Sequence, residues 1–390
     1  MNITVLTSLY PGPPRPFEGV FAERRWVGMQ TRGHSVRVVQ PLPRAPWPLG
    51  GSYAAMRAMP AREEREGISV ERPRYLHIPG CHRSNPSRFA RAGVRRVLRR
   101  SRPDVVVLDY AWPAAAAARK LRAAGLPVVI NGRGSDVLQV AGEAGLGDLL
   151  EKGLRSAGNW SAVSQDLVNA MDRLGGRTGC GVLVPNGVDL GVFQPLSAPE
   201  LQSIRGGYGI NSAAKLVVVV GHLIPRKNPL LALSGFLAGA PQDALLLFVG
   251  RGELQDELKA VVARSGERQR IRVLGELPPS ELARLVAAAD LLLLTSSREG
   301  RPNVVLEALA CGTPVVATSA GGTAELLPGF EKRLLVTSHD ADAVGAKIAA
   351  VLEDPPTSEE MRALVEPLTW DASFRSLESC LQAAIDGNSA

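Results

Sequence analysis

Short apolar runs that alternate with longer helical patterns constrain the fold of this chain most. Residues 3–8, 105–108, 216–220, 245–249 and 291–295 are rich in apolar residues, which suits strands buried on both faces of a sheet. Segments with a helical pattern of apolar residues separate these runs in both halves of the chain. A strand, a helix and a second strand at this spacing form a parallel crossover unit. We therefore predict an α/β fold built on parallel sheets.

The distribution of charge predicts two domains. Residues 1–190 contain 27 Lys and Arg against 15 Asp and Glu, a net charge of +12, whereas residues 191–390 contain 18 against 23, a net charge of −5. An Asn-Gly turn signal at residues 186–187 and a proline-containing stretch at residues 194–199 favour a boundary between the halves. A basic domain beside a mildly acidic one indicates two different partners.

Composition argues against several classes of protein. The chain has no run of eighteen apolar residues, so we expect no spanning helix, and its start shows neither a basic region nor a cleavage site. The four cysteines lie far apart without a Cys-x-x-Cys pair, which predicts neither a disulfide framework nor a metal site and fits a reducing cytoplasm. Aromatic residues make up only 5% of the chain, and no nucleic-acid-binding module is visible, so no nucleic-acid partner is expected.

The stretch of residues 297–317 carries the strongest functional signal. It contains two carboxylates, Glu299 in a predicted loop and Glu307 in a helix that begins near Pro302. The amides of residues 303–305 would point out of the helix N-terminus and form a site for phosphate. A carboxylate on each side of such a site suggests a ligand with phosphates in its middle and hydroxyls at both ends. A nucleotide sugar has that shape.

Three charged residues, Asp109, Arg133 and Asp136, stand at or just after the ends of predicted strands. Loops at the carboxyl ends of parallel strands line the ligand crevice of such sheets, so we expect all three residues in the crevice. A helix cap or a turn is the competing interpretation, most of all for Asp136.

Seven arginines lie between Arg88 and Arg102, in a stretch whose apolar residues can share one helical face. Two interpretations stay open for this helix: a solvated surface helix that covers the sheet, or a helix that binds an anionic membrane surface. Upstream of it, residues 41–60 are rich in Pro, Gly and Ala and are predicted to form an irregular insertion.

The assembled motifs resemble the retaining glycosyltransferases of family 4, within the glycosyl transferases group 1, which have the GT-B fold. The most specific part is the series Glu-Gly-x-Pro-Asn-Val-x-Leu-Glu-Ala-Leu-Ala-Cys-Gly-Thr-Pro-Val-Val-Ala, which begins at Glu299. The resemblance implies two Rossmann-like domains that face each other across a cleft. Residues 1–190 would bind the acceptor, residues 191–368 would bind the nucleotide sugar, and residues 369–390 would form a helix that crosses back to the first domain.

The resemblance also implies a role for each matched position. Lys227 and Arg226 would contact the diphosphate, and Glu299 would lie next to the sugar, which makes these three the expected catalytic residues. Glu307 would accept hydrogen bonds from the ribose hydroxyls. Other donor contacts would come from Gly19, Gly221, His222, Gly250, Leu274, Gly275, Leu277, Gly300, Pro302, Asn303 and Val304.

Two positions depart from the common family pattern. His222 stands where many members have Arg, so that Arg226 would compensate or diphosphate affinity would depend on pH. Arg133 stands where many members have His, and its guanidinium could hold phosphate or an anionic group of the acceptor. No metal is expected, because basic side chains and helix amides would take up the charge of the diphosphate.

The predicted function is transfer of a hexose-type sugar from a nucleoside diphosphate sugar to a saccharide or a lipid-linked acceptor. It would serve cell-envelope, exopolysaccharide or glycolipid synthesis, in the cytoplasm or at the inner face of the membrane. Retention is expected to follow a front-face route rather than the two-carboxylate route of glycosidases. The alternatives are a sugar-nucleotide epimerase or hydrolase on a GT-B scaffold and a non-catalytic sugar-nucleotide-binding subunit.

Overall fold

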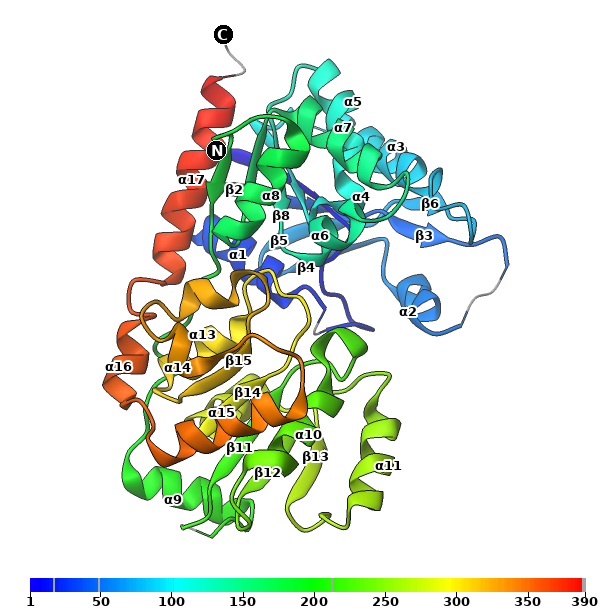
Figure 1. Ribbon diagram of the computed structural model, residues 1–390. Coiled ribbons are helices and arrows are strands. Elements are labelled where there is room, and N and C mark those ends of the chain that lie inside the picture. Colours follow the sequence, from blue (N-terminus) through cyan, green and yellow to red (C-terminus); the bar gives the residue numbers. More distant parts are fainter. Residues whose placement is uncertain (17, 48–49, 101, 212, 388–390) are drawn as a thin grey trace. The chain divides into compact units, whose positions relative to one another are not determined.

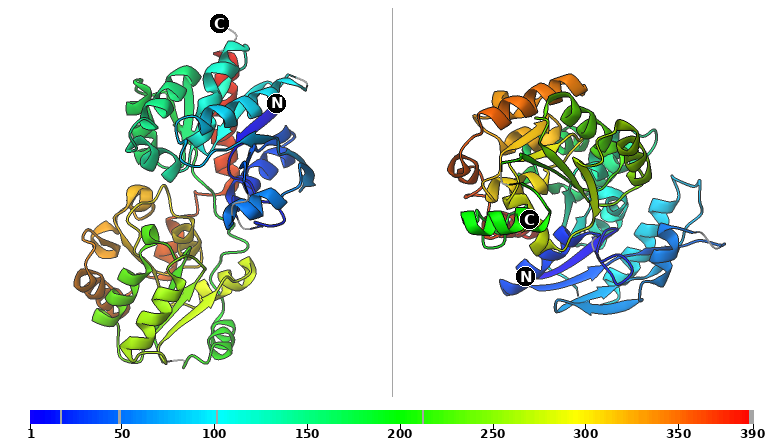
Figure 2. Two further views of the ribbon diagram at one scale, coloured as in Figure 1. Left: turned by 90° about the vertical axis from the view of Figure 1, so that its right-hand side faces the viewer. Right: turned by 90° about the horizontal axis from the view of Figure 1, so that it is seen from below.

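The computed structural model describes residues 1–16, 18–47, 50–100, 102–211 and 213–387. The chain forms two compact units: unit 1 comprises Met1–Asn186 and Trp370–Ala390, and unit 2 comprises Gly187–Thr369. Each unit is built around its own sheet of mostly parallel strands with helices beside it (Figures 1 and 2). The predicted α/β class is therefore confirmed.

The main sheet of unit 1 has the strand order β10-β9-β8-β7-β1-β2-β5-β4, and only the pairing of β4 with β5 is antiparallel. Its strands are β1 (Asn2–Thr7), β2 (Ser35–Val39), β4 (Arg62–Arg65), β5 (Ile68–Glu71), β7 (Val105–Asp109), β8 (Val128–Gly132), β9 (Asn159–Ala162) and β10 (Gly181–Leu183). Successive side chains of a strand point to opposite faces. Accordingly Val5 packs in the apolar cluster on one face and Leu6 in the cluster on the other.

Helices cover both faces of this sheet. They are α1 (Val20–Thr31), α3 (Asn85–Leu98), α4 (Ala111–Ala114), α5 (Ala118–Ala123), α6 (Ser135–Ala141), α7 (Gly147–Ala157) and α8 (Gln165–Gly175), with a 3-10 turn η1 (Ala115–Ala117). Helix α1 packs in one apolar cluster, and α3 to α8 pack in the other. Within the ranges that the structure covers, no helix is both long enough and apolar enough to cross a membrane.

The last helix, α17 (Trp370–Asp386), belongs to unit 1 and lies beside α1 although it ends the chain (Figure 1). It contributes the buried Leu377 and Leu381 to the same apolar cluster as α1, and each such side chain contributes roughly 1.5–3 kcal/mol. The two helices approach closely at Gly28, where an added Cβ would lie 1.9 Å from the Phe374 ring. The closeness of this contact therefore requires a glycine in α1.

Residues 41–60 are more regular than predicted. They contain strand β3 (Leu42–Arg44) and helix α2 (Ser52–Ala58), and β3 pairs in parallel with β6 (Arg74–Leu76) in a separate two-stranded sheet (Figure 1). The prediction of an irregular insertion is therefore wrong for the described part of this segment, since residues 48 and 49 lie outside it. The proline content hid a strand because Pro43 lies in a small two-stranded sheet, which is all edge and tolerates proline.

The arginine-rich stretch forms helix α3, which ends at Leu98. Phe89, Val94 and Val97 bury its apolar face, as the pattern predicts. Leu98, which we also expected on this face, is 50% exposed because it lies at the end of the helix. Two of the arginines form ion pairs inside unit 1, because Arg96 and Arg100 both contact the buried carboxylate of Glu71. Part of the basic charge therefore holds the helix on the sheet.

The sheet of unit 2 is entirely parallel, with the order β13-β12-β11-β14-β15-β16. Its strands are β11 (Leu216–Val220), β12 (Leu245–Val249), β13 (Ile271–Gly275), β14 (Leu291–Leu294), β15 (Val315–Thr318) and β16 (Leu335–Val336). Numbered from β11, this is the 3-2-1-4-5-6 order of the doubly wound dinucleotide fold. The order reverses between β11 and β14, which are neighbours in the sheet.

Helices also accompany the strands of unit 2. They are α9 (Ala198–Gly207), α10 (Pro229–Gly239), α11 (Gln255–Ser265), α12 (Pro279–Ala287), α13 (Asn303–Ala310), α14 (Glu331–Leu334), α15 (Ala341–Glu353) and α16 (Ser358–Ala363), with 3-10 turns η2 (Pro225–Lys227) and η3 (Gly321–Leu326). Helices α10 to α16 contribute buried side chains to one apolar cluster with the sheet. This cluster is the hydrophobic core of the described part of unit 2.

Candidate active site

The topology of unit 2 singles out the loops that follow β11 and β14. In doubly wound sheets, ligands bind outside the carboxyl ends of the strands at the point where the strand order reverses. Here the two loops are tied together by hydrogen bonds: the Thr295 hydroxyl donates to the carbonyl of Asn228 at 2.8 Å, and the Ser297 amide donates to the carbonyl of Arg226 at 2.8 Å. The expected ligand position and the motifs found in the sequence thus coincide.

Two cations and one carboxylate meet between these loops. Lys227 Nζ lies 2.5 Å from Glu299 Oε1, and Arg226 Nη1 lies 3.4 Å from Glu299 Oε2. The Arg226 guanidinium also donates to the carbonyl of Arg298 at 3.0 Å. Glu299 is buried, with 8% of its surface exposed. Its carboxylate therefore contacts both cations on their side that faces the protein interior. The structure thus places the three expected catalytic residues in one cluster with a net positive charge.

The N-terminus of α13 lies directly after this cluster in the chain. The helix begins at Asn303, and Pro302 in the N-cap position offers no side-chain hydrogen bond to it. The Val305 amide donates to the carbonyl of Pro302 at 3.2 Å, so our expectation that this amide is available to phosphate is wrong. The chain packs tightly just before the helix: the Gly322 amide donates to the Gly300 carbonyl at 3.1 Å. The remaining amides of this turn carry the positive end of the helix dipole.

Glu307 lies one turn further along α13. It is spaced four residues from Asn303 and is half-buried like it, whereas Val304, Val305 and Leu306 are buried. Residues four apart in a helix share a face. Asn303 and Glu307 therefore occupy the face of α13 that its core-facing residues leave accessible.

Three glycines lie side by side at the carboxyl ends of β11, β12 and β13. The Gly221 amide donates to the Val249 carbonyl at 2.9 Å, and the Gly250 amide donates to the Gly275 carbonyl at 2.7 Å. Gly250 has a φ of 134°, and a Cβ there would lie 2.0 Å from the Gly221 carbonyl oxygen. Only glycine therefore allows this approach of two strand ends.

The other residues of unit 2 that we expect to bind the sugar nucleotide lie at the same edge of the sheet. His222 follows Gly221 with an exposed side chain, and Leu274 and Leu277 are half-buried around the turn after β13. Gly19 belongs to unit 1, where it precedes α1 in a left-handed conformation with a φ of 79°. Its expected approach to the phosphates stays a prediction.

Two buried polar atoms in the loop after β14 have no hydrogen-bond partner among the described residues: Ser296 Oγ and Arg301 Nε. The Arg301 side chain is 8% exposed, and burial lowers the pKa of its guanidinium while Glu325 opposes the shift. Buried donors in native proteins are nearly always satisfied, so these atoms mark a place for an additional polar partner. Neither side chain was predicted from the sequence as part of the site, although the charge of Arg301 at a variable position of the motif was a usable signal.

The charged residues predicted for the crevice of unit 1 form a buried network instead. The Arg133 guanidinium contacts Asp109 through two hydrogen bonds of 2.9 Å, and Asp109 also accepts from Trp26 Nε1 at 2.8 Å and Asn131 Nδ2 at 2.6 Å. Asp109 is fully buried, which would raise its pKa, but Arg133 outweighs burial and lowers the value to about 2. Asp109 and Arg133 therefore neutralise each other, and their expected contact with an acceptor stays a prediction.

Asp136 also bonds to the chain itself. Its carboxylate accepts hydrogen bonds from the backbone amides of Ala111 at 2.5 Å and Arg133 at 2.9 Å, which ties the start of α4 to the turn before α6. Burial raises the pKa of Asp136 to about 6, although these hydrogen bonds oppose the shift. The turn-residue interpretation thus accounts for its contacts.

Two doubly wound units on one chain, one with a cationic cluster at its switch point, define a GT-B glycosyltransferase architecture. HepE of Anabaena, solved in complex with UDP, superimposes with a TM-score of 0.75 at 21% identity, over 98% of this chain and 100% of HepE. Residues 202–365 match the family Glycosyl transferases group 1, and residues 19–187 match a glycosyl transferase 4-like domain.

Two curated relatives extend these matches. The putative teichuronic acid biosynthesis glycosyltransferase TuaC of Bacillus subtilis is 30% identical over 356 residues, which are 89% of this chain and 88% of TuaC. D-inositol 3-phosphate glycosyltransferase of Segniliparus rotundus is 32% identical over 53% of this chain and 47% of its own length. The chain belongs to the group 1 glycosyltransferases and is a transferase, which disfavours both alternatives considered above.

Proposed function

We propose that the chain transfers a hexose-type sugar, with retention, from a nucleoside diphosphate sugar to a saccharide or lipid-linked acceptor of the cell envelope. The observation that carries this proposal is the cluster of Lys227, Arg226 and Glu299 at the switch point of unit 2. Preorganised cations suit a leaving group that gains negative charge as its bond to the sugar breaks. The relative TuaC, whose name places it in teichuronic acid biosynthesis, supports a role in envelope synthesis.

The donor would bind along the carboxyl edge of the unit 2 sheet. Lys227 and Arg226, together with the N-terminus of α13, would contact the diphosphate, and Glu307 would accept hydrogen bonds from the ribose diol. The turn at residues 274–277 would contact the base. The Anabaena protein HepE, solved with UDP and with UDP-glucose, makes a UDP-sugar the first donor to test.

The reaction would exchange one glycosidic bond for another. The bond between the anomeric carbon and the diphosphate oxygen breaks, and the acceptor hydroxyl oxygen bonds to the same carbon on the same face. The hydroxyl proton passes to the departing diphosphate, which leaves as the nucleoside diphosphate. Glu299 already contacts both cations, so we assign it to positioning the sugar and the cations rather than to a covalent intermediate. We also propose that the transfer reaction needs no metal ion.

A donor screen tests the proposed function directly. Thermal-shift measurements over UDP-, GDP- and ADP-hexoses should identify one nucleotide that raises the melting temperature, because a ligand that binds only the folded state stabilises it. The same nucleotide should fail to stabilise a Lys227→Ala variant to the same extent. If no nucleotide sugar stabilises the wild type at millimolar concentration, the assignment of the donor site is wrong.

We also propose that the protein acts at the inner face of the membrane and binds it peripherally. Arg91, Arg95 and Arg99 are exposed, and in the part of the chain that the structure describes none of them has an ion-pair partner. They are spaced four residues apart, so they share one face of α3 and its end. Such an arginine row would be attracted to anionic lipid headgroups.

A further inference from the structure

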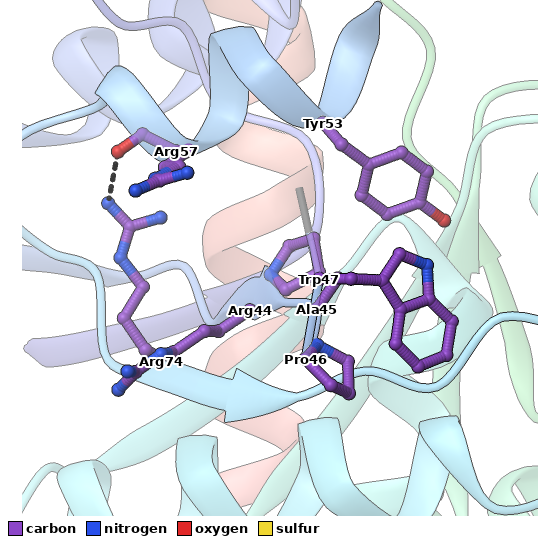
Figure 3. A pocket seen from close by; sticks show the side chains of 8 residues that line it. Arg44, Ala45, Pro46, Trp47, Tyr53, Arg57 and Arg74 are labelled. Atoms are coloured by element: carbon purple, nitrogen blue, oxygen red, sulfur yellow. Dashed lines mark hydrogen bonds between the residues drawn. The ribbon is translucent and has the colours of Figure 1, made fainter. Parts of the chain in front are cut away.

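A cavity lies in unit 1, among residues that the proposed sugar-nucleotide site does not use. Strand β3, helix α2 and strand β6 contribute to a pocket of about 480 Å³, within the roughly 300–1,000 Å³ typical of ligand sites. Figure 3 shows its walls: Trp47 and Tyr53 lie on one side, and the guanidinium groups of Arg44, Arg57 and Arg74 lie on the other. The pocket therefore has an aromatic wall and a cationic wall.

The cationic wall is held by Arg74. Its guanidinium donates to the carbonyl oxygens of Met56 at 2.8 Å and Met59 at 2.6 Å, at the C-terminal end of α2. These bonds satisfy the carbonyls of the last helical turn and fasten α2 to β6. Arg74 therefore has a structural role that keeps the wall in place.

The other two arginines, Arg44 and Arg57, provide the charge of the cationic wall. Arg44 and Arg57 are exposed, and neither has an ion-pair partner among the residues that the structure covers. No acidic side chain is among the described residues that line the pocket. Two of the acids that follow α2 in the chain pair with other arginines: Glu63 pairs with Arg72, and Glu71 pairs with Arg96. Two unpaired guanidiniums that face one cavity suit a carboxylate or a phosphate group.

The aromatic wall combines a fixed ring and an exposed one. The Tyr53 hydroxyl lies 2.9 Å from His77 Nε2, and the two rings lie 5.4 Å apart, so Tyr53 is anchored. Trp47 is 51% exposed, which is unusual for the largest apolar side chain in proteins. A flat, half-exposed indole beside polar groups is suited to pack on the apolar face of a sugar ring.

We propose that this pocket binds an anionic saccharide, with the sugar ring against Trp47 and its acidic group between Arg44 and Arg57. The acidic group has two possible sources with the same chemistry, a uronate carboxylate or a phosphate linked to the sugar. The identification of this saccharide as the acceptor rests on the proposed transferase function. The proposal that the pocket binds an anionic saccharide does not depend on that function.

Calorimetric titration of the full chain tests the proposal. The ligands are a glucuronic acid disaccharide, its neutral carboxyl-reduced counterpart, glucose 1-phosphate and inorganic diphosphate. One of the two anionic sugars should bind at least tenfold more tightly than the neutral disaccharide, and which of them does so identifies the source of the charge. Equal affinity for the anionic and neutral sugars would overturn the proposal. Tighter binding of inorganic diphosphate than of either anionic sugar would also overturn it, provided that the pocket substitutions described below abolish that binding.

Substitutions locate the binding. The double variant Arg44→Ala and Arg57→Ala should weaken binding of the anionic sugar at least tenfold, and Trp47→Ala should weaken it while Trp47→Phe restores part of the affinity. The matched control is Arg119→Ala, which removes an exposed arginine of α5. Melting temperatures within a few degrees of wild type establish that the variants are folded. Unchanged affinity in the folded pocket variants would overturn the proposal.

Donor measurements separate this proposal from the proposed function. The pocket variants should bind the nucleotide sugar like the wild type, because none of the changed residues belongs to unit 2. If the wild type binds the anionic sugar but transfers nothing to it, the acceptor assignment fails and the pocket stands. The opposite result is that no anionic sugar binds, while the pocket variants transfer sugar to neutral acceptors at the full rate. In that case the pocket proposal fails and the proposed transferase function is retained.

Discussion

Lys227 Nζ lies 2.5 Å from the buried carboxylate of Glu299, although the two residues follow different strands and are 72 positions apart in the chain. The neighbouring β11 and β14 bring them together at the reversal of strand order. The carboxylate thereby fixes the position of the cation before any ligand arrives. The proposed function depends on this preorganisation, since fixed charges need no rearrangement at the moment of reaction.

The Lys227–Glu299 pair predicts non-additive kinetics. Replacing Lys227 by Ala should lower kcat/KM about 10²–10³-fold, as expected for loss of one preorganised donor. Glu299→Ala should lower kcat by a similar factor, and the double variant should lose less than the product of the two single losses, because contacting residues are coupled. Nucleotide release from the donor measures all three. Activities within threefold of wild type would show that the pair is not part of the site.

Glu307 should contribute to donor binding rather than to turnover. Glu307→Gln should raise the donor KM about tenfold, since a hydrogen bond to a charged group is worth about 1.5 kcal/mol, and should leave kcat nearly unchanged. The control is Glu353→Gln, which changes an exposed carboxylate at the end of α15. A fall in kcat at unchanged KM would assign Glu307 to the chemical step instead.

The Asp109–Arg133 pair predicts an acid-sensitive unit 1. Asp109 has a pKa of about 2 in the folded protein against an ordinary value of 3.8. Because the folded pKa is the lower one, the stabilisation is complete well above pH 4 and is lost as the pH falls through 2. The shift corresponds to about 2 kcal/mol at neutral pH, of which about 1 kcal/mol should be lost at pH 3.

Denaturant unfolding of Asp109→Asn measures this effect. All five tryptophans belong to unit 1, so their fluorescence reports its unfolding. The variant should be destabilised by about 3–5 kcal/mol at pH 7, because Arg133 is left buried and unpaired, and by about 1 kcal/mol less at pH 3. Asp148→Asn, an exposed change in α7, is the control. A destabilisation that is equal at the two pH values would contradict the low pKa of Asp109.

The exposed arginine row of α3 should govern any membrane binding. Reversing Arg91, Arg95 and Arg99 to Glu should reduce cosedimentation with anionic vesicles severalfold, and salt should weaken the wild-type binding. Reversing Arg119, Lys120 and Arg268, three exposed cations elsewhere, changes the net charge equally. If both triple variants bind vesicles alike, only net charge matters and the helix merely covers the sheet.

The sequence predicted those parts of the fold whose signal is local. Strands β11 and β12 lie where the apolar pattern placed them, because strands buried on both faces need continuous apolar runs. Strand β4, with the sequence Arg-Glu-Glu-Arg, escaped prediction because it is an edge strand whose pairing with β5 is its main source of order. A charged edge strand lacks the alternation of apolar and polar residues from which a strand is predicted.

The residues of the candidate site also differ in whether a local sequence signal or tertiary packing determines their role. The motif after β14 revealed Glu299 and Glu307, since the spacing of the two acids is a property of the chain. Whether a charged residue at a strand end faces a ligand or another charge depends on tertiary packing. Asp109 and Arg133 therefore looked like ligand groups, whereas their side chains satisfy each other.

Sugar transfer itself is the central claim, and nucleotide release with and without acceptor tests it most directly. Purified protein is incubated with the stabilising nucleotide hexose, alone and with a panel of neutral, anionic and lipid-linked saccharides. We predict that nucleoside diphosphate appears only with acceptor, in equal amount to a new glycoside, and that Glu299→Gln greatly slows both. Release at the same rate without any acceptor, and with free sugar as the product, would contradict the transferase account.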